Sequence, residues 1–272
     1  MLAWMSFLPS LRFKPKASTQ EMERASSDKR SLYAESKSYP PPSDLPLCAN
    51  FCSSNLTVGS GVAIFHLATA RVVLCYHSKE HYHFLPKGRK DVNEATTRGA
   101  EREGYEESGF RNRLLPVPIP HRQPQPHNTG TSVPQPFVSE AIWAQLAPVS
   151  RSAQYMLFWY AAETIPPSIE AELNARASET GGLYEAPPPF EHDLTIAQRI
   201  DMEPNDYQPV RHENTGVDED ELLYQSSLVP IDEAIDKLGE GSISADVVRQ
   251  GWQAIQKRRQ IEESADSGKP LT

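Results

Sequence analysis

Residues 88–110 have the sequence GRKDVNEATTRGAEREGYEESGF, in which the acidic residues have helical spacing. Glu103, Glu106 and Glu107 stand at positions i, i+3 and i+4, which places three carboxylates on one face of a helix. Crowded carboxylates repel one another, but they are the ligands expected for a hard divalent cation, which prefers oxygen donors. The spacing therefore indicates a helix that binds metal. A solvent-exposed acidic face would show the same spacing, so this alternative stays open.

Two further features distinguish this predicted helix. Gly99 and Gly104 lie inside it, and a glycine in a helix interior costs about 1 kcal/mol relative to alanine. Such a departure from local preference often marks a closely packed functional site. Arg102 can pair with Glu94 or with Glu101, and either pair would fix the helix relative to the loop before it.

The loop that precedes the helix is basic. Lys87, Arg89 and Lys90 can contact the oxygens of a polyphosphate, because cationic side chains form strong hydrogen bonds with phosphate. Asp91 and Glu94 have the spacing of a capping box, which is a purely structural alternative for these two acidic residues.

Strand and helix patterns surround this segment in the sequence. They are a hairpin at 58–66 and 71–78, a short strand at 81–86, a buried strand from Gln154 to about Ala162, an extended segment at 221–230, and helices at 230–239 and 244–264. Pro230 is expected in the first turn of one helix, and Ser244 is expected as the N-cap of the other. The order of elements indicates an α/β protein with a single compact core.

The remaining sequence is rich in proline and polar residues. It predicts a disordered tail at 1–50, a domain at 51–264 with two long loop insertions at about 115–138 and 165–215, and a C-terminal tail at 265–272. The N-terminus lacks the charged region that opens a signal peptide, and a transit peptide is an alternative to a disordered tail.

Composition excludes several classes of function. With 27 Lys and Arg against 36 Asp and Glu, the net charge is −9, which argues against broad binding to nucleic acid or anionic membranes. No apolar run of about 20 residues could span a bilayer. Three cysteines suit a reducing compartment, the cytoplasm or the nucleus. Cys48 and Cys52 lack a second pair of metal ligands, and Cys75 falls within a predicted strand.

The segment Gly88–Phe110 resembles the Nudix box, the signature of the Nudix hydrolase family. The pattern is Gly, five residues, Glu, seven residues, Arg-Glu, an aliphatic residue, any residue, Glu-Glu, any residue, Gly and an apolar residue. Every charged and glycine position of the pattern matches here. The one departure is Gly104, which stands where an aliphatic residue is usual and bears on helix packing more than on catalysis.

The resemblance implies a Nudix-type α/β/α sandwich with a mixed sheet. It implies hydrolysis of a diphosphate by water with Mg²⁺ or Mn²⁺ as cofactor. Glu103, Glu106 and Glu107 match the metal ligands of the family, together with the carbonyl of Gly88. Arg102 and Glu94 match the pair that orients the helix, and Glu106 or Glu107 can also take part in deprotonating the water. Carboxylates outside the box are alternative bases, namely Glu140, Glu219 and Glu221.

The substrate is expected to be a small polyphosphate, and the box does not define it. The tripeptide Pro86–Gly88 resembles a form found in diadenosine and diphosphoinositol polyphosphate hydrolases and in messenger-RNA decapping enzymes. The expected substrates are therefore a nucleoside diphosphate linked to another group, a dinucleoside polyphosphate or a diphosphoinositol polyphosphate. An RNA cap hydrolase and a non-catalytic interaction module are the alternatives. The acidic charge counts against the first, and the complete set of carboxylates counts against the second. The oligomeric state is left open.

Several other side chains have two interpretations. Arg111 and Arg113 can extend the basic region or be exposed surface charges. Aromatic residues and histidines near the predicted strands can contact a substrate or belong to the core and its surroundings; these are Tyr155, Trp143, Trp159, His81 and His83.

Overall fold

The computed structural model describes residues 48–124, 136–148, 153–180 and 184–266. Most of the two predicted tails, at 1–50 and 265–272, and the middle of the first predicted insertion lie outside the described residues. The predicted domain limits at residues 51 and 264 therefore stay a prediction.

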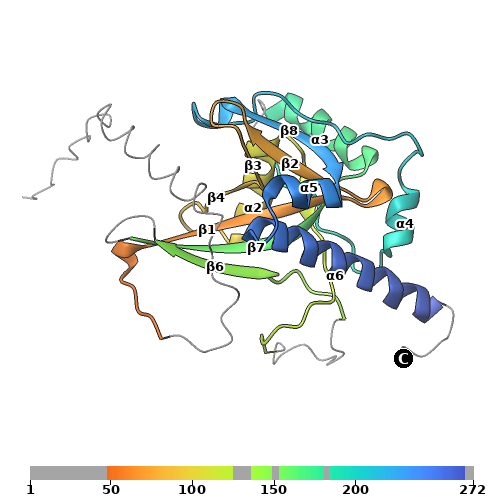
Figure 1. The fold of residues 1–272 in the computed structure, drawn as a ribbon. Coiled ribbons are helices and arrows are strands. Elements are labelled where there is room, and N and C mark those ends of the chain that lie inside the picture. Colours follow the sequence, from red (N-terminus) through yellow and green to blue (C-terminus); the bar gives the residue numbers. More distant parts are fainter. Residues whose placement is uncertain (1–47, 125–135, 149–152, 181–183, 267–272) are drawn as a thin grey trace, which may run out of the picture.

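A mixed sheet forms the centre of the molecule (Figure 1). Its described strands are β1 (Leu56–His66), β2 (Arg71–His77), β3 (Tyr82–Phe84), β4 (Lys87–Arg89), β5 (Asn112–Leu114), β6 (Trp143–Pro148), β7 (Gln154–Thr164) and β8 (Tyr224–Pro230). The main order is β3-β2-β1-β7-β5, while β4 pairs with β1, β6 with β7, and β8 with β2. Strands β1 and β7 run parallel, and the other pairs are antiparallel. The predicted hairpin, β1 with β2, is confirmed.

Helices cover both faces of this sheet, as Figure 1 shows. The described α-helices are α2 (Thr96–Ser108), α3 (Pro167–Thr180), α4 (Ile196–Asp201), α5 (Ile231–Leu238) and α6 (Ile243–Asp266). Short 3-10 helices are η2 (Ser53–Asn55), η3 (Leu67–Thr69) and η4 (Glu221–Leu223). Helix α2 packs on one face, and α5 and α6 pack on the other. The expected α/β/α sandwich with a mixed sheet is confirmed.

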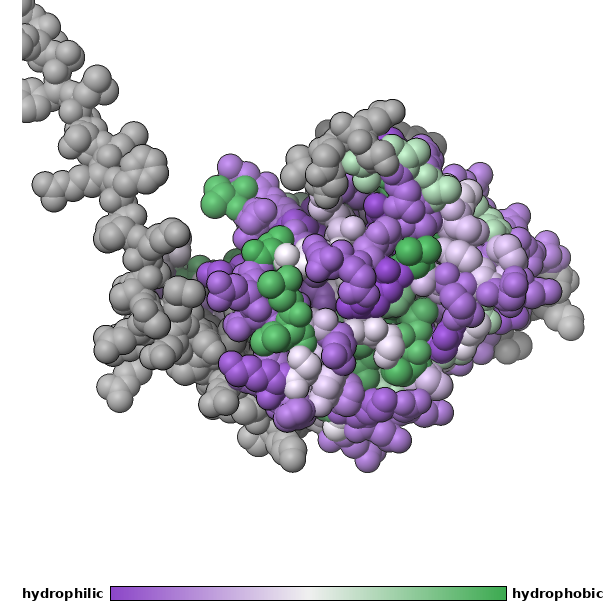
Figure 2. Space-filling view, turned by 90° about the horizontal axis from the view of Figure 1, so that it is seen from above, coloured by the Kyte–Doolittle hydropathy of each residue, from purple (hydrophilic) through white to green (hydrophobic). Residues whose placement is uncertain are grey.

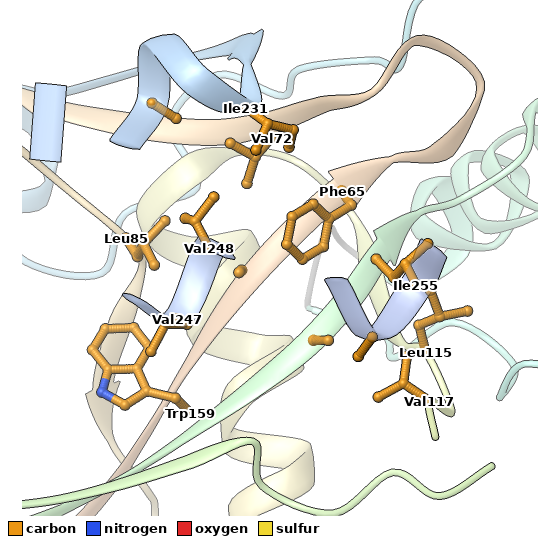
Figure 3. Packing of buried hydrophobic residues seen from close by; sticks show 14 of the residues in the cluster. Phe65, Val72, Leu85, Leu115, Val117, Trp159, Ile231, Val247, Val248 and Ile255 are labelled. Carbon is orange, nitrogen blue, oxygen red and sulfur yellow. The ribbon is translucent and has the colours of Figure 1, made fainter. Parts of the chain in front are cut away.

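Alternation along β1 explains why the sheet is covered twice. Val62 and Ile64 pack with Ala100 of α2, whereas the alternate residues Ala63 and Phe65 belong to the larger cluster with Val248 of α6. Successive side chains of a strand point to opposite faces, so a strand that is apolar at every position must be covered on both sides. Figure 3 shows the larger cluster, in which Phe65 and Val72 of the sheet approach Val248 and Ile255 of α6.

The outer surface is mostly polar. The space-filling view in Figure 2 shows a face on which hydrophilic residues predominate and hydrophobic residues gather in small patches. Among the described residues, no helix is both long enough and apolar enough to cross a bilayer.

The second predicted insertion is not a long loop, and this prediction was wrong. Residues 165–215 contain α3 and α4, and they add buried apolar side chains to the molecule, including Leu173, Phe190 and Ile196. The helices are short or weakly amphipathic, so periodicity did not indicate them. The first predicted insertion also contributes core residues, because Leu115 and Val117 are each 1% exposed.

The predicted helix limits needed two corrections. Helix α6 begins at Ile243, and Ser242, rather than Ser244, caps it: the Oγ of Ser242 accepts a hydrogen bond from the N–H of Ala245 at 3.2 Å. Helix α5 ends before Gly239, as predicted, but it begins at Ile231, so Pro230 is its N-cap and not a residue of its first turn. Cys75 is buried in β2, as its place in the pattern indicated.

Candidate active site

Helix α2 carries the acidic cluster and is fixed at both ends. It begins at Thr96, after a turn in which the N–H of Asp91 donates to Glu94 Oε2 at 2.8 Å and the N–H of Glu94 donates to the carbonyl of Asp91 at 3.1 Å. Asp91 and Glu94 therefore brace the preceding loop and do not cap the helix. At the other end, Gly109 adopts a left-handed conformation with φ 75°, which a glycine accepts without strain.

Arg102 lies at the centre of the cluster. Its guanidinium donates to both oxygens of Glu94, at 3.0 and 2.9 Å, and to the carbonyl of Arg89 at 3.0 Å. The predicted pair with Glu94 is thus present, whereas Glu101 instead pairs with Arg98. Arg102 also donates to Glu103 at 2.9 Å and to Glu106 at 2.6 Å. One guanidinium therefore joins the loop before α2 to two of the three carboxylates on the helix.

Glycine at position 88 lets the helix approach strand β4. A Cβ atom at Gly88 would lie 1.9 Å from Oε2 of Glu103, so any side chain there would displace this carboxylate. The carbonyl of Gly88 accepts a hydrogen bond from the hydroxyl of Tyr155 at 2.8 Å. Next to it, the N–H of Lys87 donates to Oε2 of Glu107 at 2.7 Å. The structure thus brings Gly88, Glu103 and Glu107 together, with Glu106 held beside them by Arg102.

Burial makes these carboxylates reluctant to ionise without a bound cation. Burial raises the pKa of Glu103 to about 7, despite the attraction of Arg102. Burial likewise raises the pKa of Glu106, and it raises the pKa of Glu107 well above its ordinary value against the charge of Lys87. A divalent cation would reverse this balance, because it favours the ionised carboxylate.

The donor atoms suit a hard cation, but their arrangement is not that of a bound metal. Four oxygen-bearing groups converge from α2 and β4, which is the donor chemistry that Mg²⁺ and Mn²⁺ prefer. Within the part of the chain that the structure describes, no three acidic, histidine or cysteine side chains stand in metal-binding geometry. The reason is visible in the contacts, because Glu103 and Glu106 turn to Arg102 while Glu107 turns to Lys87.

The basic residues before α2 lie along the edge of this cluster. Strand β4 carries Lys87 and Arg89. The positive charge of Lys87 opposes the rise in the pKa of Glu107 that burial causes. The charge of Lys90 helps to lower the pKa of Glu94. The Nζ of Lys90 donates to the carbonyl of Asp91 at 3.1 Å. These positions leave Lys87 nearest to the acidic face.

Among the three candidate bases outside the box, Glu221 is the one whose charge affects the cluster. Its charge raises the pKa of Glu103, of Glu106 and of Glu107, although burial is the larger cause in each case. Glu140 and Glu219 are solvent-exposed. The charge of Glu140 helps to raise the pKa of Tyr160, which lies outside the cluster of carboxylates.

The loop before η4 places Glu221 there. The hydroxyl of Thr215 donates to the carbonyl of Glu106 at 2.9 Å, and the N–H of Val217 donates to Oε2 of Glu221 at 2.6 Å. The loop is thereby tied to the last turns of α2. No sequence signal indicated the contact of Thr215, because it joins segments 109 residues apart.

Two arginines that follow α2 do not extend the basic region. Arg111 is 8% exposed and pairs with Glu170 at 2.6 Å, and Arg113 is 2% exposed and pairs with Glu163 at 2.7 Å. Both interpretations from the sequence, phosphate contact and exposed surface charge, were therefore wrong. The partners come from the segment after β6, which the sequence pattern did not place near α2.

The aromatic residues lie in or against the core, and His81 lies in a turn. Tyr155 and Trp159 are buried in the core cluster on the α6 face, and Trp143 is partly buried against it. His81 lies in the turn before β3, where its Nδ1 bonds with the hydroxyl of Tyr76 at 2.7 Å.

Comparisons with known proteins were made for both sequence and structure. No protein-family model and no curated protein matches the sequence. Among solved structures, the chain is similar to a Nudix hydrolase from Nitrosomonas europaea, at 13% identity over 75% of this chain and 91% of that chain, with a TM-score of 0.36. It is also similar to the C. elegans Ap4A hydrolase, at 10% identity over 73% of this chain and 97% of that chain, with a TM-score of 0.38. A UDP-X diphosphatase matches at 14% identity over 86% of this chain and 72% of that chain, with a TM-score of 0.35. At these identities and TM-scores, the function of this chain rests on its own residues.

Proposed function

We propose that this chain is a metal-dependent hydrolase that cleaves a diphosphate linkage. The observation that carries the proposal is the geometry of the complete box, in which Glu103 and Glu107 of α2 lie against the backbone of Gly88 and Lys87 and Arg102 holds Glu106. The expected substrates are a nucleoside diphosphate linked to another group, a dinucleoside polyphosphate or a diphosphoinositol polyphosphate.

Each part of the site has a task in this reaction. The three carboxylates and the Gly88 carbonyl would hold Mg²⁺ or Mn²⁺, which when bound neutralises charge that develops on the phosphate oxygens. Lys87, with Arg89 and Lys90 beside it, would bind those oxygens through charge-assisted hydrogen bonds. Arg102 and Glu94 would orient the helix.

Proton transfer falls to a carboxylate. Water attacks one phosphorus atom, its proton passes to a carboxylate, and the bridging oxygen leaves with the second phosphoryl group. Glu221 is one candidate acceptor, because its loop is tied to the last turns of α2 through Thr215 and its charge raises the pKa of all three carboxylates. Glu106 and Glu107 are the alternative acceptors.

A substrate panel tests this function. The full chain would be incubated with Mg²⁺ or Mn²⁺ and with diphosphate-containing metabolites, and released phosphate or nucleotide would be measured. Activity that requires the metal and is lost in Glu106→Gln and Glu107→Gln is the expected result. Equal activity of the variants and the wild-type chain would refute the proposal.

The alternatives give different results in the same panel. A cap hydrolase would release the cap from capped RNA and leave the small molecules intact. A non-catalytic interaction module would bind metal, as measured by calorimetry, and turn over none of the substrates. No contact among the described residues favours either alternative over hydrolysis of a small polyphosphate.

A further inference from the structure

A cavity of about 290 Å³ lies on the face of the sheet opposite α2. Leu85, which follows β3, and Leu157 of β7 supply apolar surface to it. The corner between α5 and α6 closes it with Lys237 and Ser242. A cavity of this size with a largely apolar lining and a few polar groups is typical of a site for a small organic ligand.

The charged groups around this cavity have one sign. The ionised side chains of its lining are Lys87 and Lys237, and the lining includes no aspartate or glutamate; His83 also lines it, but burial and the charge of Lys237 lower the pKa of this histidine. The chain as a whole has 36 Asp and Glu residues and a net charge of −9. Lys237 pairs with Glu233 at 2.6 Å, yet this glutamate does not line the cavity. A cavity of this kind in an acidic protein favours an anionic ligand.

The N-terminus of α6 meets the same cavity. Ile243 and Ser244, the first residues of a 24-residue helix, line it. Their N–H groups have no partner within the helix, and the helix dipole adds positive potential at this end. Ser242 uses its Oγ to accept the N–H of Ala245, so its hydroxyl hydrogen stays available to a ligand.

A buried donor without a partner provides an independent indication. Trp159 is 2% exposed and lines the cavity, and its indole Nε1 has no hydrogen-bond partner among the described residues. Figure 3 shows this indole beside Val247, near the start of α6. A buried polar group usually has a partner, and leaving one unpaired costs about 1–3 kcal/mol. An acceptor atom of a ligand in the cavity would satisfy this N–H.

The cavity adjoins the candidate active site through two residues. Lys87 lines the cavity, and its backbone N–H bonds with Glu107 at 2.7 Å. Tyr155 also lines the cavity, and its hydroxyl bonds with the carbonyl of Gly88 at 2.8 Å. A ligand that begins at the carboxylates of α2 can therefore continue past Lys87 and Tyr155 toward α6.

We propose that this cavity is a second anion subsite, which binds a phosphate monoester on the ribose of a nucleoside at the far end of the substrate. This rests on the proposed hydrolysis of a diphosphate at α2. The nucleobase packs against Leu85 and Leu157, and the additional phosphate accepts hydrogen bonds from the first residues of α6 and from Trp159 Nε1, beside Lys237. The substrate class is a nucleoside diphosphate derivative whose ribose bears a further phosphate monoester.

Binding without metal tests the subsite separately from catalysis. Calorimetry with EDTA would compare adenosine 2′,5′-bisphosphate with AMP, which lacks the additional phosphate. We expect the bisphosphate to bind about tenfold or more tightly, as for a charge-assisted hydrogen bond. Lys237→Gln and Trp159→Phe should each reduce this preference, and the matched control Lys257→Gln, on the exposed surface of α6, should retain it. Equal binding of the two nucleotides, or an unchanged preference in Lys237→Gln, would overturn the proposal.

Turnover then distinguishes the subsite from the function on which it rests. NADP and NAD both contain a diphosphate and differ by one ribose phosphate, so the ratio of their kcat/KM values reports on the subsite. A ratio well above 1 that falls in Lys237→Gln supports the proposal, whereas a ratio near 1 refutes the subsite and leaves the hydrolase intact. If no diphosphate is hydrolysed, the proposed hydrolase function is refuted. The calorimetry would then still test whether the cavity binds the additional phosphate. Binding of the bisphosphate without inhibition of hydrolysis would refute its place in the substrate path.

Discussion

At the residue scale, the single departure from the box has a structural explanation. A Cβ atom at Gly104 would lie 2.5 Å from Nδ2 of Asn112 and 2.9 Å from Cγ1 of Val62. Asn112 is 1% exposed, and its Nδ2 donates to the carbonyl of Glu101 at 3.0 Å. The space that an aliphatic side chain would fill is therefore taken by Asn112, and glycine is what lets α2 pack against β1 and β5.

This packing predicts that Gly104→Ala is destabilising. Alanine favours a helix by about 1 kcal/mol over glycine, but the added methyl group overlaps Asn112 and Val62, which costs about 1–3 kcal/mol. Urea unfolding should show a net loss for Gly104→Ala and a smaller loss for Gly104→Ala with Asn112→Ala than the two single changes predict together. A higher unfolding midpoint for Gly104→Ala alone would contradict this packing.

Gly88 carries a second prediction at this scale. Because its Cβ position lies 1.9 Å from the Glu103 carboxylate, Gly88→Ala should displace that carboxylate and reduce metal-dependent turnover by about 100-fold, the scale of losing one group that stabilises the transition state. Initial rates at saturating metal would measure the effect. Activity equal to that of the wild-type chain would show that Glu103 need not stay beside β4.

At the element scale, a buried ion network holds the second insertion on the sheet. Glu163 of β7 is fully buried between Arg113 of β5, at 2.7 Å, and Arg199 of α4, at 2.8 Å. Arg199 also pairs with Glu203 at 2.8 Å, and Glu203 bonds with His66 of β1 at 2.9 Å. These contacts connect α4 with three strands, and they explain how a six-residue helix keeps its place.

Glu163→Gln is therefore expected to destabilise the chain strongly. The change leaves two arginines buried without their carboxylate, which for a buried pair costs about 3–5 kcal/mol. The control Glu172→Gln removes an exposed pair with Arg176, which is worth about 0.3–0.5 kcal/mol. The free energy of unfolding in urea should separate the two variants. Similar losses in both would show that the network does not hold the insertion.

The sequence predicted the strongly patterned elements and missed those whose pattern is weak, such as α3, or too short to show a period. The hairpin, β7, α5 and α6 were predicted because their apolar residues repeat with a clear period. Strands β4 and β5 have three residues each, too few to show a period. The box placed the acidic residues on α2, because they share one helix. The burial of Arg111 and Arg113 was not predictable, since their partners lie 59 and 50 residues away.

At the scale of the whole molecule, opposite charges lie on opposite faces of one sheet. Buried carboxylates of α2 lie on one side, the cavity with Lys237 and the start of α6 lies on the other, and Lys87 borders both. A metal would compensate the acidic side, and a phosphate would compensate the basic side. Part of the net charge of −9 is therefore concentrated where a cation is expected.

Metal should stabilise the whole chain through this acidic side. A ligand that binds only the folded state raises stability by about 2.7 kcal/mol at a concentration of 100 times its Kd. Mg²⁺ or Mn²⁺ should therefore raise the Tm of the wild-type chain and raise it much less in Glu107→Gln. The Tm of each chain in buffer with EDTA and no added metal is the reference value. Identical shifts in the two chains would place the metal elsewhere.

The most direct test of the active site is one ratio of rates. The substrate that the panel identifies would be hydrolysed at saturating Mg²⁺ by Glu106→Gln and by the control Glu172→Gln, and kcat/KM would be compared. If the carboxylates of α2 carry the reaction, kcat/KM should fall at least about 100-fold in Glu106→Gln and should not fall in Glu172→Gln. Equal values of kcat/KM for the two variants would contradict the assignment of the reaction to this helix.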